Sequence, residues 1–536
     1  MDLSLEQEVL AWIADDPDPK TAAQLQQWLD AGNESELRAS FNGFLQFGTA
    51  GLRGPIRPGP SGMNRAVVGR AAAGIVAYMK ERNLTSVVIG RDARYGSEDF
   101  TFETAEIMSG AGMKVYVLPR PLPTPVLAFA TNELKCDVGI MVTASHNPPQ
   151  DNGYKVYLGG TVDGIHYRGS QIVSPTDEAI ATKIDAVSSL KSEPRGKVWE
   201  VLGEEIVDKY VNRTASLAGT PGSLRIVYTA MHGVGTETIQ RVFQKAGFQS
   251  PILVQAQAAP DPDFPTVAFP NPEEPGAIDL ALETARSFDA HLVIANDPDA
   301  DRCAAAVNDP VSGWRMLRGD ELGAIFAESI ARKIDSGIFA NSIVSSSIVK
   351  KIAEHYNLEF KETLTGFKWI SKIDNLLFGY EEALGYCVDQ KNVNDKDGIS
   401  AALILVQIVN ELKANGQSVF DYLEKLGNEY GFHRTDQISI RVTNLNEIDE
   451  LLKKVTTTPP QTLLNNALKS YENLSESKVM PTVGVRLNYE NGIRVIIRPS
   501  GTEPKIKCYI EVISSTKNEA ENLISQIKQA LTKVLT

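Results

Sequence analysis

HLVIANDPDADR, residues 291–302, joins a short apolar run to a loop that carries three aspartates. The run His291–Ala295 has the length of a buried strand, and the charged loop follows at its end. The same plan recurs along the chain, where apolar runs end in turns rich in Gly, Asp or Pro and helical patterns follow. The other runs are Ser86–Ile89, Lys114–Leu118, Asp137–Val142 and Leu224–Tyr228. Strands that alternate with helices predict α/β layers with largely parallel sheets.

Two helices and a different C-terminal pattern complete this prediction. Helices are expected over Arg65–Arg82, with Asn64 as N-cap, and over Glu321–Ile334, with Asp320 as N-cap. Near the C-terminus, Asn491–Gly492 is typical of the turn of a β-hairpin. The elements predicted around it are the hairpin strands Thr482–Tyr489 and Ile493–Ile497, a strand Lys505–Ile513 and a helix Asn518–Leu535. This pattern predicts a smaller α+β domain.

A chain of 536 residues is too long for one hydrophobic core, so about three to five domains are expected. Plausible boundaries are the linker-like residues 214–224, the approach to Gly319–Asp320 and the stretch near 431–436. These give four domains, at residues 1–215, 216–319, 320–435 and 436–536. In chain order they contain the polar stretches 142–155, 297–302, 379–386 and 497–507.

The overall charge and the cysteines exclude several classes of protein. The formal net charge of −14 argues against general nucleic-acid binding, which needs a basic surface. The longest strongly apolar stretch, 401–409, is far too short to span a membrane, and the acidic N-terminus is unlike a signal peptide. Four scattered cysteines without a CxxC pair indicate reduced, buried thiols. We therefore expect a cytoplasmic protein.

The three aspartates of the opening stretch indicate a metal site. Asp297, Asp299 and Asp301 follow one another at alternate positions, so in an extended segment their side chains share a face. Three neighbouring carboxylates repel one another, and a hard divalent cation, above all Mg²⁺, relieves that repulsion. Two alternatives are a solvated acidic turn and a haloacid-dehalogenase-type phosphatase, in which the first aspartate is the nucleophile.

A second stretch, VTASHNPPQDNGYK at residues 142–155, sets Ser145 beside His146 and closes on Lys155. The pair suggests a serine hydrolase, but sequence neighbours seldom form a catalytic triad, and a G-x-S-x-G turn is absent. Ser145 is better explained as a phosphoryl carrier whose phosphate is balanced by the cation at the aspartates. His146 is then expected to hold the loop in shape rather than to act as a base.

Several further loops place polar groups beside glycines. In IRPSGTEPKIK, residues 497–507, a guanidinium, two hydroxyls and a flexible glycine match a phosphate, although the P-loop pattern is absent. In GYEEALGY, residues 379–386, two glutamates between glycines could accept hydrogen bonds from sugar hydroxyls, and a lysine follows in NDKDG. The Gly–Arg turns FGTAGLRG (47–54) and GRDAR (90–94) are weak signals by themselves. The residues concerned are Arg498, Ser500, Gly501, Thr502, Lys505, Glu381, Glu382, Lys396, Arg53, Arg91 and Arg94.

From about Phe47 to the C-terminus the chain resembles the α-D-phosphohexomutase superfamily of phosphoglucomutases and phosphomannomutases. TASHNP, the DxDxDR loop, the EE loop and RPSGTEP occur in that superfamily's order and approximate spacing. The resemblance removes the dehalogenase alternative. It implies four domains around a central cleft, three of them similar mixed α/β domains and the last a smaller α+β domain.

The resemblance also implies a role for each matched residue. Ser145 would be a phosphoserine, and one Mg²⁺ per chain would be held by Asp297, Asp299, Asp301 and an oxygen of the serine phosphate. The catalytic set would further include Lys155, Lys396, Arg53 and His146, with the two lysines matching residues assigned to acid–base work. The substrate-binding set would be Glu381 and Glu382 for sugar hydroxyls, Arg302 after the metal loop, and Arg498, Ser500, Gly501, Thr502 and Lys505 for the non-reacting phosphate.

The expected activity is interconversion of hexose 1-phosphate and hexose 6-phosphate, most of all of glucose and also of mannose, through a sugar bisphosphate. Ala383 and Ala50 stand where many relatives have Ser and Asp, which favours a branch that includes phosphopentomutases. The alternatives are therefore a phosphopentomutase and, from another class, an inactive sugar-phosphate-binding regulator. The expected partners are small sugar phosphates, with no nucleic acid or membrane, and the expected assembly is a monomer or weak homodimer.

Overall fold

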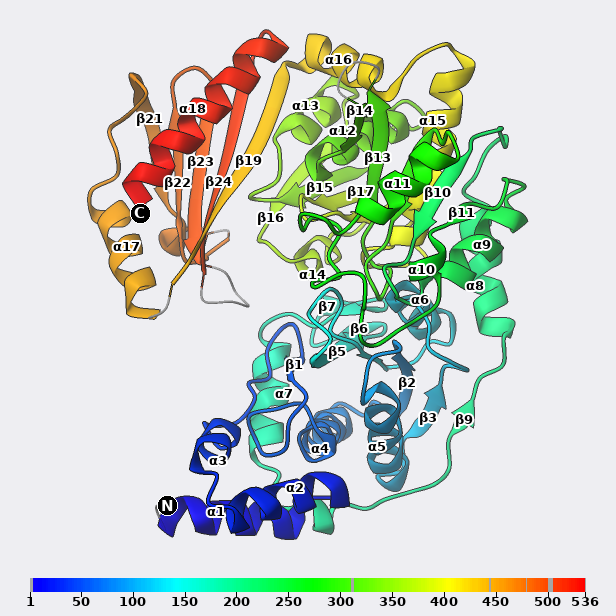
Figure 1. Ribbon diagram of the computed structural model, residues 1–536, viewed down its shortest axis with the longest axis vertical. Coiled ribbons are helices and arrows are strands. Elements are labelled where there is room, and N and C mark those ends of the chain that lie inside the picture. The colour runs from blue at the N-terminus through cyan, green and yellow to red at the C-terminus, as the bar shows by residue number, and fades with distance from the viewer. Residues whose placement is uncertain (1–2, 310–312, 443–444, 479, 500–504, 536) are drawn as a thin grey trace. The chain divides into compact units, whose positions relative to one another are not determined.

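A computed structural model describes residues 3–309, 313–442, 445–478, 480–499 and 505–535. The chain divides into two compact units, each made of separate segments. The first unit is the chain up to Leu317 together with Ser371–Asp374 and Ala383–Asn410. The second is Arg318–Ile370, Asn375–Glu382 and the chain from Glu411 onward. The elements of both are labelled in Figure 1.

The first unit opens with a mixed seven-stranded sheet. Its central strands are parallel and largely buried, as their continuous apolar runs predict. Across the sheet the order is β1 (Leu52–Pro55), β5 (Asp151–Leu158), β4 (Val138–Val142), β2 (Ser86–Arg91), β3 (Lys114–Val117) and β9 (Glu200–Val201), with β8 (Ser170–Gln171) beside β5. The strands β5 and β1 run antiparallel to their neighbours. The strands predicted near residues 86, 114 and 137 are thus confirmed.

Helices and a small hairpin surround this sheet. The helices are α4 (Arg65–Glu81), α5 (Ser97–Gly110), α6 (Thr124–Glu133), α7 (Thr176–Asp185) and α8 (Glu205–Ala215), and the hairpin is β6 (Thr161–Val162) with β7 (Ile165–His166). Three N-terminal helices precede them, α1 (Leu3–Asp15), α2 (Pro19–Asp30) and α3 (Glu34–Ser40). These three pack around Leu5, Val9, Leu25 and Leu37, a small apolar cluster that the sequence analysis did not predict.

A second sheet in the same unit carries the acidic loop. Its order is β11 (Ile252–Leu253), β10 (Ile226–Thr229), β12 (Leu292–Ala295), β13 (Ala304–Asp309) and β14 (Gly313–Met316). The first three strands are parallel, and the last two are antiparallel to their neighbours. The accompanying helices are α9 (Gly235–Lys245), α10 (Gln255–Ala258) and α11 (Asp279–Ser287). The unit is completed by β18 (Gly385–Cys387) and by the start of α15 (Gly398–Ala414).

The second unit contains a parallel layer and an antiparallel one. In the parallel layer β15 (Ile338–Ser342) lies between β16 (Glu359–Thr363) and β17 (Leu376–Glu381). Its helices are α12 (Gly319–Ala331), α13 (Ile348–His355), α14 (Phe367–Ile370) and α16 (Val419–Tyr430). The alternation of strands and helices accounts for the predicted α/β class.

The antiparallel layer is the C-terminal sheet. Its order is β19 (Phe432–Arg441), β24 (Lys505–Ser514), β23 (Ile493–Pro499), β22 (Val485–Tyr489), β21 (Asn466–Asn473) and β20 (Thr462–Leu463). Helix α18 (Lys517–Leu535) packs against β19 and β24 (Figure 1), and α17 (Leu445–Thr457) contacts β23. The predicted turn between β22 and β23 is confirmed, because Asn491 and Gly492 both have positive φ, 56° and 70°. The prediction omitted β19, β20 and β21.

The two predicted N-caps have different outcomes. Asn64 caps α4 as expected, with its Oδ1 accepting from Val67 N at 2.9 Å. Asp320, however, is inside α12, whose N-cap is Arg318, so this prediction was wrong. The Asp320 carboxylate instead accepts hydrogen bonds from the backbone of Ser346 and from the hydroxyls of Tyr380 and Thr435. Partners distant in sequence therefore decide its position.

All four cysteines are buried and unbridged, as expected. Within the described part of the chain, none of the helices is at once long and apolar enough to cross a bilayer.

Candidate active site in the first unit

Ser145 lies at the end of β4, on a tight turn. Its φ is 53°, in the left-handed region that few residues other than glycine adopt. The hydroxyl of Thr143 accepts from Ser145 N at 2.9 Å and stabilises this turn. Only 3% of Ser145 is exposed, and its Oγ donates to Asp297 Oδ2 at 2.8 Å. The structure thus brings the predicted nucleophile into direct contact with the predicted metal loop.

Arg94 holds the backbone of the serine loop. Its two terminal nitrogens donate to the carbonyl oxygens of Ser145, Asn147, Pro148 and Asp151, at 2.6 to 3.2 Å. Its Nε lies 3.3 Å from the buried carboxylate of Asp92, and its guanidinium lies over the ring of Phe264. The GRDAR motif was a weak signal by itself, because a Gly–Arg turn more often serves structure or a surface ion pair. The acceptors of Arg94 are backbone carbonyls, which leave no mark in the residue pattern.

The three aspartates converge at the end of β12. Single carboxylate oxygens of Asp297, Asp299 and Asp301 lie within 4.8 Å of one another, and all three residues are buried. Asp299 Oδ1 and Asp301 Oδ1 are buried without a hydrogen-bond partner among the described residues. Unpaired anionic oxygens are costly in a protein interior. A hard divalent cation fits such a donor set, because it would take up the orphaned oxygens.

Two lysines compensate part of this negative charge. Lys155, on β5, places its Nζ 2.7 Å from Asp299 Oδ2 and 3.0 Å from Asp301 Oδ2. Lys396 Nζ lies 3.3 Å from the same oxygen of Asp301. Burial by itself would raise the pKa of Asp301. The positive charges of these two lysines outweigh that effect and hold the pKa below its ordinary value. By contrast, burial and the charges of its two neighbours raise the pKa of Asp297.

The remaining predicted residues of this unit surround the same centre. Arg53 is on β1, and Arg53 Nη1 donates to Asn147 Oδ1 at 3.3 Å. The turn before it requires glycine, because Gly51 has φ 75° and a Cβ there would lie 1.8 Å from Tyr154 O. Arg302 Nε lies 3.9 Å from Asp297 Oδ2, while its Nη1 pairs with Glu273 at 3.6 Å, a partner that the sequence analysis missed.

His146 is placed as a structural neighbour of the serine. Its Nδ1 lies 3.2 Å from Ser145 Oγ. Burial and the positive charges of Arg302 and Arg53 hold the pKa of His146 well below its usual value. A lowered pKa favours the neutral form of the ring at neutral pH.

Glu381, Glu382 and Arg498 belong to the second unit. Glu381 Oε1 accepts from Gly366 N at 2.7 Å, and Glu382 Oε2 accepts from the hydroxyls of Ser342 and Ser345, both at 3.0 Å. Burial and the charges of Glu381 and Asp320 raise the pKa of Glu382 to about 7. Arg498 is near the end of β23, and Lys505 begins β24. Ser500, Gly501 and Thr502 lie outside the described residues.

Comparison with known proteins agrees with this arrangement. The four domain models of phosphoglucomutase/phosphomannomutase match in order: α/β/α domains I, II and III at residues 45–190, 206–313 and 318–430, and the C-terminal domain at 438–529. Such consecutive matches define a phosphosugar mutase fold of four domains. The chain belongs to the phosphoglucomutase/phosphomannomutase family, within the α-D-phosphohexomutase superfamily. It is thus an enzyme of the mutase class, and the mixed α/β fold class is confirmed.

Particular relatives extend over nearly the whole chain. "Probable phosphomannomutase" of Haemophilus influenzae is 45% identical over 480 residues, 88% of this chain and 98% of that protein. Phosphoribomutase of Saccharomyces cerevisiae is 34% identical over 97% of this chain and 94% of its own length. The solved structure of a phosphoglucomutase/phosphomannomutase family protein from Burkholderia thailandensis has a TM-score of 0.70 at 18% identity, covering 91% of this chain and 97% of that chain.

Proposed function

We propose that the protein interconverts the 1- and 6-phosphates of a hexose by way of a phosphoserine at Ser145. The observation that carries this proposal is the hydrogen bond from Ser145 Oγ to Asp297, inside a buried triplet of aspartates that two lysines contact. A hydroxyl so placed can carry a phosphoryl group whose charge is balanced locally.

Asp297, Asp299 and Asp301 would hold one Mg²⁺, which when bound would offset negative charge on the transferring phosphoryl group. The orphaned oxygens of Asp299 and Asp301 support this assignment. Arg53 and Arg302 add fixed positive charge beside the serine, and such preorganised charge favours a transition state in which negative charge spreads over phosphoryl oxygens.

The proposed transfer has two halves. First, a sugar hydroxyl oxygen forms a bond to phosphorus while the bond between phosphorus and Ser145 Oγ breaks, and the hydroxyl proton passes to a nearby base. The resulting sugar bisphosphate then returns its other phosphoryl group to Ser145 Oγ, which leaves the isomeric monophosphate. Lys155 and Lys396, which lie at the aspartates that face the serine, are the candidate proton carriers: the neutral amine of one of them would accept the hydroxyl proton, and the resulting ammonium would return it to the sugar oxygen released in the second half.

Residues of the second unit would recognise the rest of the substrate. Glu381 and Glu382 supply carboxylates for sugar hydroxyls, and Arg498 supplies a guanidinium for the phosphate that is not transferred. The family resemblance adds Ser500, Gly501, Thr502 and Lys505 to the phosphate-binding set. Small sugar phosphates, with a sugar bisphosphate as intermediate and activator, are therefore the proposed ligands.

A hexose is the preferred sugar in this proposal, with glucose first and mannose second. Support for a hexose comes from the 45% identity to a protein named as a phosphomannomutase. A pentose phosphate is the second candidate, favoured by a phosphoribomutase that aligns over 97% of this chain. Ala383, in place of the more usual serine of the sugar loop, points in the same direction.

The test is a rate comparison with purified protein, Mg²⁺ and a trace of glucose 1,6-bisphosphate. Glucose 1-phosphate, mannose 1-phosphate and ribose 1-phosphate are compared by kcat/KM, and we expect the better hexose to exceed ribose by at least about tenfold, or ~1.4 kcal/mol. A faster reaction with ribose would establish the second candidate. Binding of sugar phosphates without any turnover would favour the regulator.

Ser145→Ala tests the phosphoserine. This variant should keep the wild-type Tm, lose detectable turnover and no longer gain the mass of one phosphoryl group on incubation with the bisphosphate. Turnover close to the wild-type rate in Ser145→Ala would rule out the phosphoserine route.

A further inference from the structure

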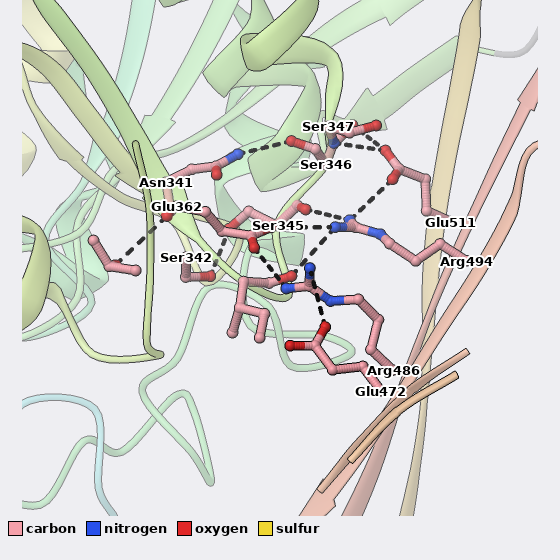
Figure 2. Close-up of polar contacts among 12 residues, drawn as sticks. Asn341, Ser342, Ser345, Ser346, Ser347, Glu362, Glu472, Arg486, Arg494 and Glu511 are labelled. Carbon is pink, nitrogen blue, oxygen red and sulfur yellow. Dashed lines mark hydrogen bonds and ion pairs between the residues drawn. The ribbon is translucent and has the colours of Figure 1, made fainter. Parts of the chain in front are cut away.

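The turn between β15 and α13, residues 342–347, is rich in serine and connects two parts of the second unit (Figure 2). On one side the hydroxyls of Ser342 and Ser345 both donate to Glu382 Oε2 at 3.0 Å. The backbone N–H of Glu382 in turn donates to Ser345 Oγ at 3.1 Å. Ser342 and Ser345 are almost fully buried, with 0% and 1% exposure, so these bonds are shielded from water.

On the other side, the C-terminal sheet holds the same turn. Arg494, on β23, donates to the carbonyl oxygens of Ile343 and Ser345, as Figure 2 shows for the serine. Arg494 Nη2 also pairs with Glu511 on β24 at 2.9 Å. Glu511 Oε1 accepts from Ser346 Oγ and Ser347 N, both at 2.7 Å.

These contacts link Glu382 to the strand that carries Arg498, and the proposed function assigns both residues to one substrate. Arg494 and Arg498 lie on the same strand, β23, and an even number of positions separates them. Their side chains therefore lie on the same face of the strand, and a shift of β23 would move both. Tyr509 on β24 packs with Ile343 and Val344, and burial together with the charge of Glu382 raises the pKa of Tyr509 while Arg498 opposes that rise. The charges of Glu382 and Arg498 therefore act on the same tyrosine, from opposite directions.

We propose that Arg494 and Ser345 are positioning residues that fix Glu382 relative to the phosphate-binding strand β23, and so set the length of sugar phosphate that is accepted. This inference rests on the proposed function, since it takes Glu382 as a reader of sugar hydroxyls and Arg498 as a phosphate ligand. Hexose and pentose phosphates differ in the distance from the phosphate to the sugar hydroxyls. A fixed spacing between Glu382 and Arg498 would therefore favour one of the two over the other. If this spacing becomes less rigid, substrate binding should weaken and the preference between hexose and pentose phosphates should decrease.

Arg486 offers a matched control on the neighbouring strand β22. Its guanidinium pairs with Glu362 at 2.6 Å and with Glu472 at 3.8 Å. Figure 2 shows it beside Arg494, so both arginines lie at the same face of the sheet. Arg486→Gln thus removes ion pairs from this face, and the hydrogen bonds of Arg494 and Ser345 to the serine turn and to Glu382 do not involve it. Glu362 also lies 3.8 Å from Arg494, so this control keeps one carboxylate that Arg494 shares.

The experiment compares the wild type with Arg494→Gln, Ser345→Ala and Arg486→Gln. KM, kcat, Tm and the ratio of kcat/KM for hexose and ribose 1-phosphate are measured for each. Arg494→Gln and Ser345→Ala should raise the KM for the hexose phosphate about tenfold and reduce the hexose-to-ribose ratio by a similar factor. Their kcat should fall less than KM rises, because Ser145 and the aspartates are unchanged. Arg486→Gln should alter both quantities less than about threefold.

Ser345→Ala keeps the inference testable if Arg494→Gln does not fold, because it deletes a single hydroxyl. Equal kinetics in Ser345→Ala and Arg486→Gln, with an active wild type, would overturn the positioning role and leave the mutase proposal standing. A wild type that converts none of the sugar phosphates would instead overturn the proposed function, and the positioning role with it.

Discussion

Arg94 shows how much of the site depends on one buried side chain. Its guanidinium spans four carbonyl oxygens of the loop that carries Ser145, and it is also paired with Asp92. Arginine suits this role because its planar fork presents several donors in fixed directions, which a lysine does not. The left-handed φ of Ser145 is maintained by bonds of this kind.

Arg94→Lys should therefore lower kcat by about 10²-fold, since small displacements of a reacting group have costs of that order. The lysine can still pair with Asp92, but it cannot reach all four carbonyls. Steady-state kinetics and the phosphoryl occupancy of Ser145 by mass spectrometry are the measurements.

Arg91→Gln, in the same GRDAR motif, is the control for this change. Arg91 pairs with the exposed side chain of Glu98 at 2.9 Å, so its loss should alter kcat less than twofold. An Arg94→Lys enzyme with wild-type kcat would show that the loop keeps its shape without the guanidinium.

Residue types and spacing were sufficient to predict that Ser145 acts together with the three aspartates, while Lys155 and Lys396 were added through the family resemblance. Charge repulsion among carboxylates and the chemistry of hydroxyls and amines can be read from a sequence. The roles of Arg94 and Glu273 could not, because one binds backbone carbonyls and the other comes from a proline-rich loop. Neither leaves a pattern of side chains to recognise.

Among the elements, strands β23 and β24 contain the least expected feature, a buried glutamate in a sheet. Glu511 is 3% exposed and is surrounded by Arg494, His433 and the serines of the turn. Burial alone would raise its pKa, but Arg494 and the hydrogen bonds from His433 and Ser346 hold the pKa of Glu511 well below 4.5. The carboxylate is thus stabilised in its charged form.

This depressed pKa predicts a pH dependence of stability. A carboxyl group whose pKa is lower in the folded state stabilises the protein above its unfolded pKa, near 4.5, and that contribution is lost as the pH falls below it. The difference in free energy of unfolding between the wild type and Glu511→Gln should be about 3 kcal/mol at pH 7 and should shrink once the pH falls below about 4.5. Urea unfolding at several pH values measures this difference.

A difference that stays constant from pH 7 down to about pH 3 would show that Glu511 does not contribute through its charge. Glu519→Gln serves as the control. Glu519 is an exposed residue of α18, for which a small difference at every pH is expected.

The apolar pattern predicted some of the helices and strands, such as α4 and β12, but not the role of Asp320. Its position just before an apolar-periodic stretch is typical of an N-cap, yet its carboxylate binds Thr435 and Tyr380 instead. Local patterns indicate which residues can cap a helix, and tertiary contacts decide which residue does. Strands β19, β20 and β21 and the N-terminal helices were not predicted either.

At the scale of the whole molecule, the division into two units differs from the linear division into domains. Segments near residues 371 and 385 join the first unit although they lie within the third predicted domain. Lys396 reaches Asp301 in this way, and Tyr210 donates to Asp397 beside it at 2.8 Å. The order of the motifs predicted domains that follow one another along the chain. A unit built from separate segments leaves no signal in the local sequence pattern.

The buried aspartates also predict that a divalent cation stabilises the molecule. Mg²⁺ that binds the folded state alone should add about 2.7 kcal/mol to the free energy of unfolding at 100 times its Kd. The Tm should rise with Mg²⁺ and fall after chelation, and Asp299→Asn should remove most of the rise. Scanning calorimetry measures these Tm values in the absence of substrate. Equal Tm with Mg²⁺ and with chelator would argue against the proposed metal site.

The discontinuous make-up of the first unit has a consequence for synthesis on the ribosome. Asp297, Asp299 and Asp301 emerge well before Lys396, which belongs to the segment Ala383–Asn410 that completes this unit. Until that segment emerges, the nascent chain carries an acidic loop that lacks one of its two lysines. The first unit therefore cannot finish folding when its N-terminal part has emerged. The charges of its acidic loop are balanced only late in translation, when Lys396 has been added.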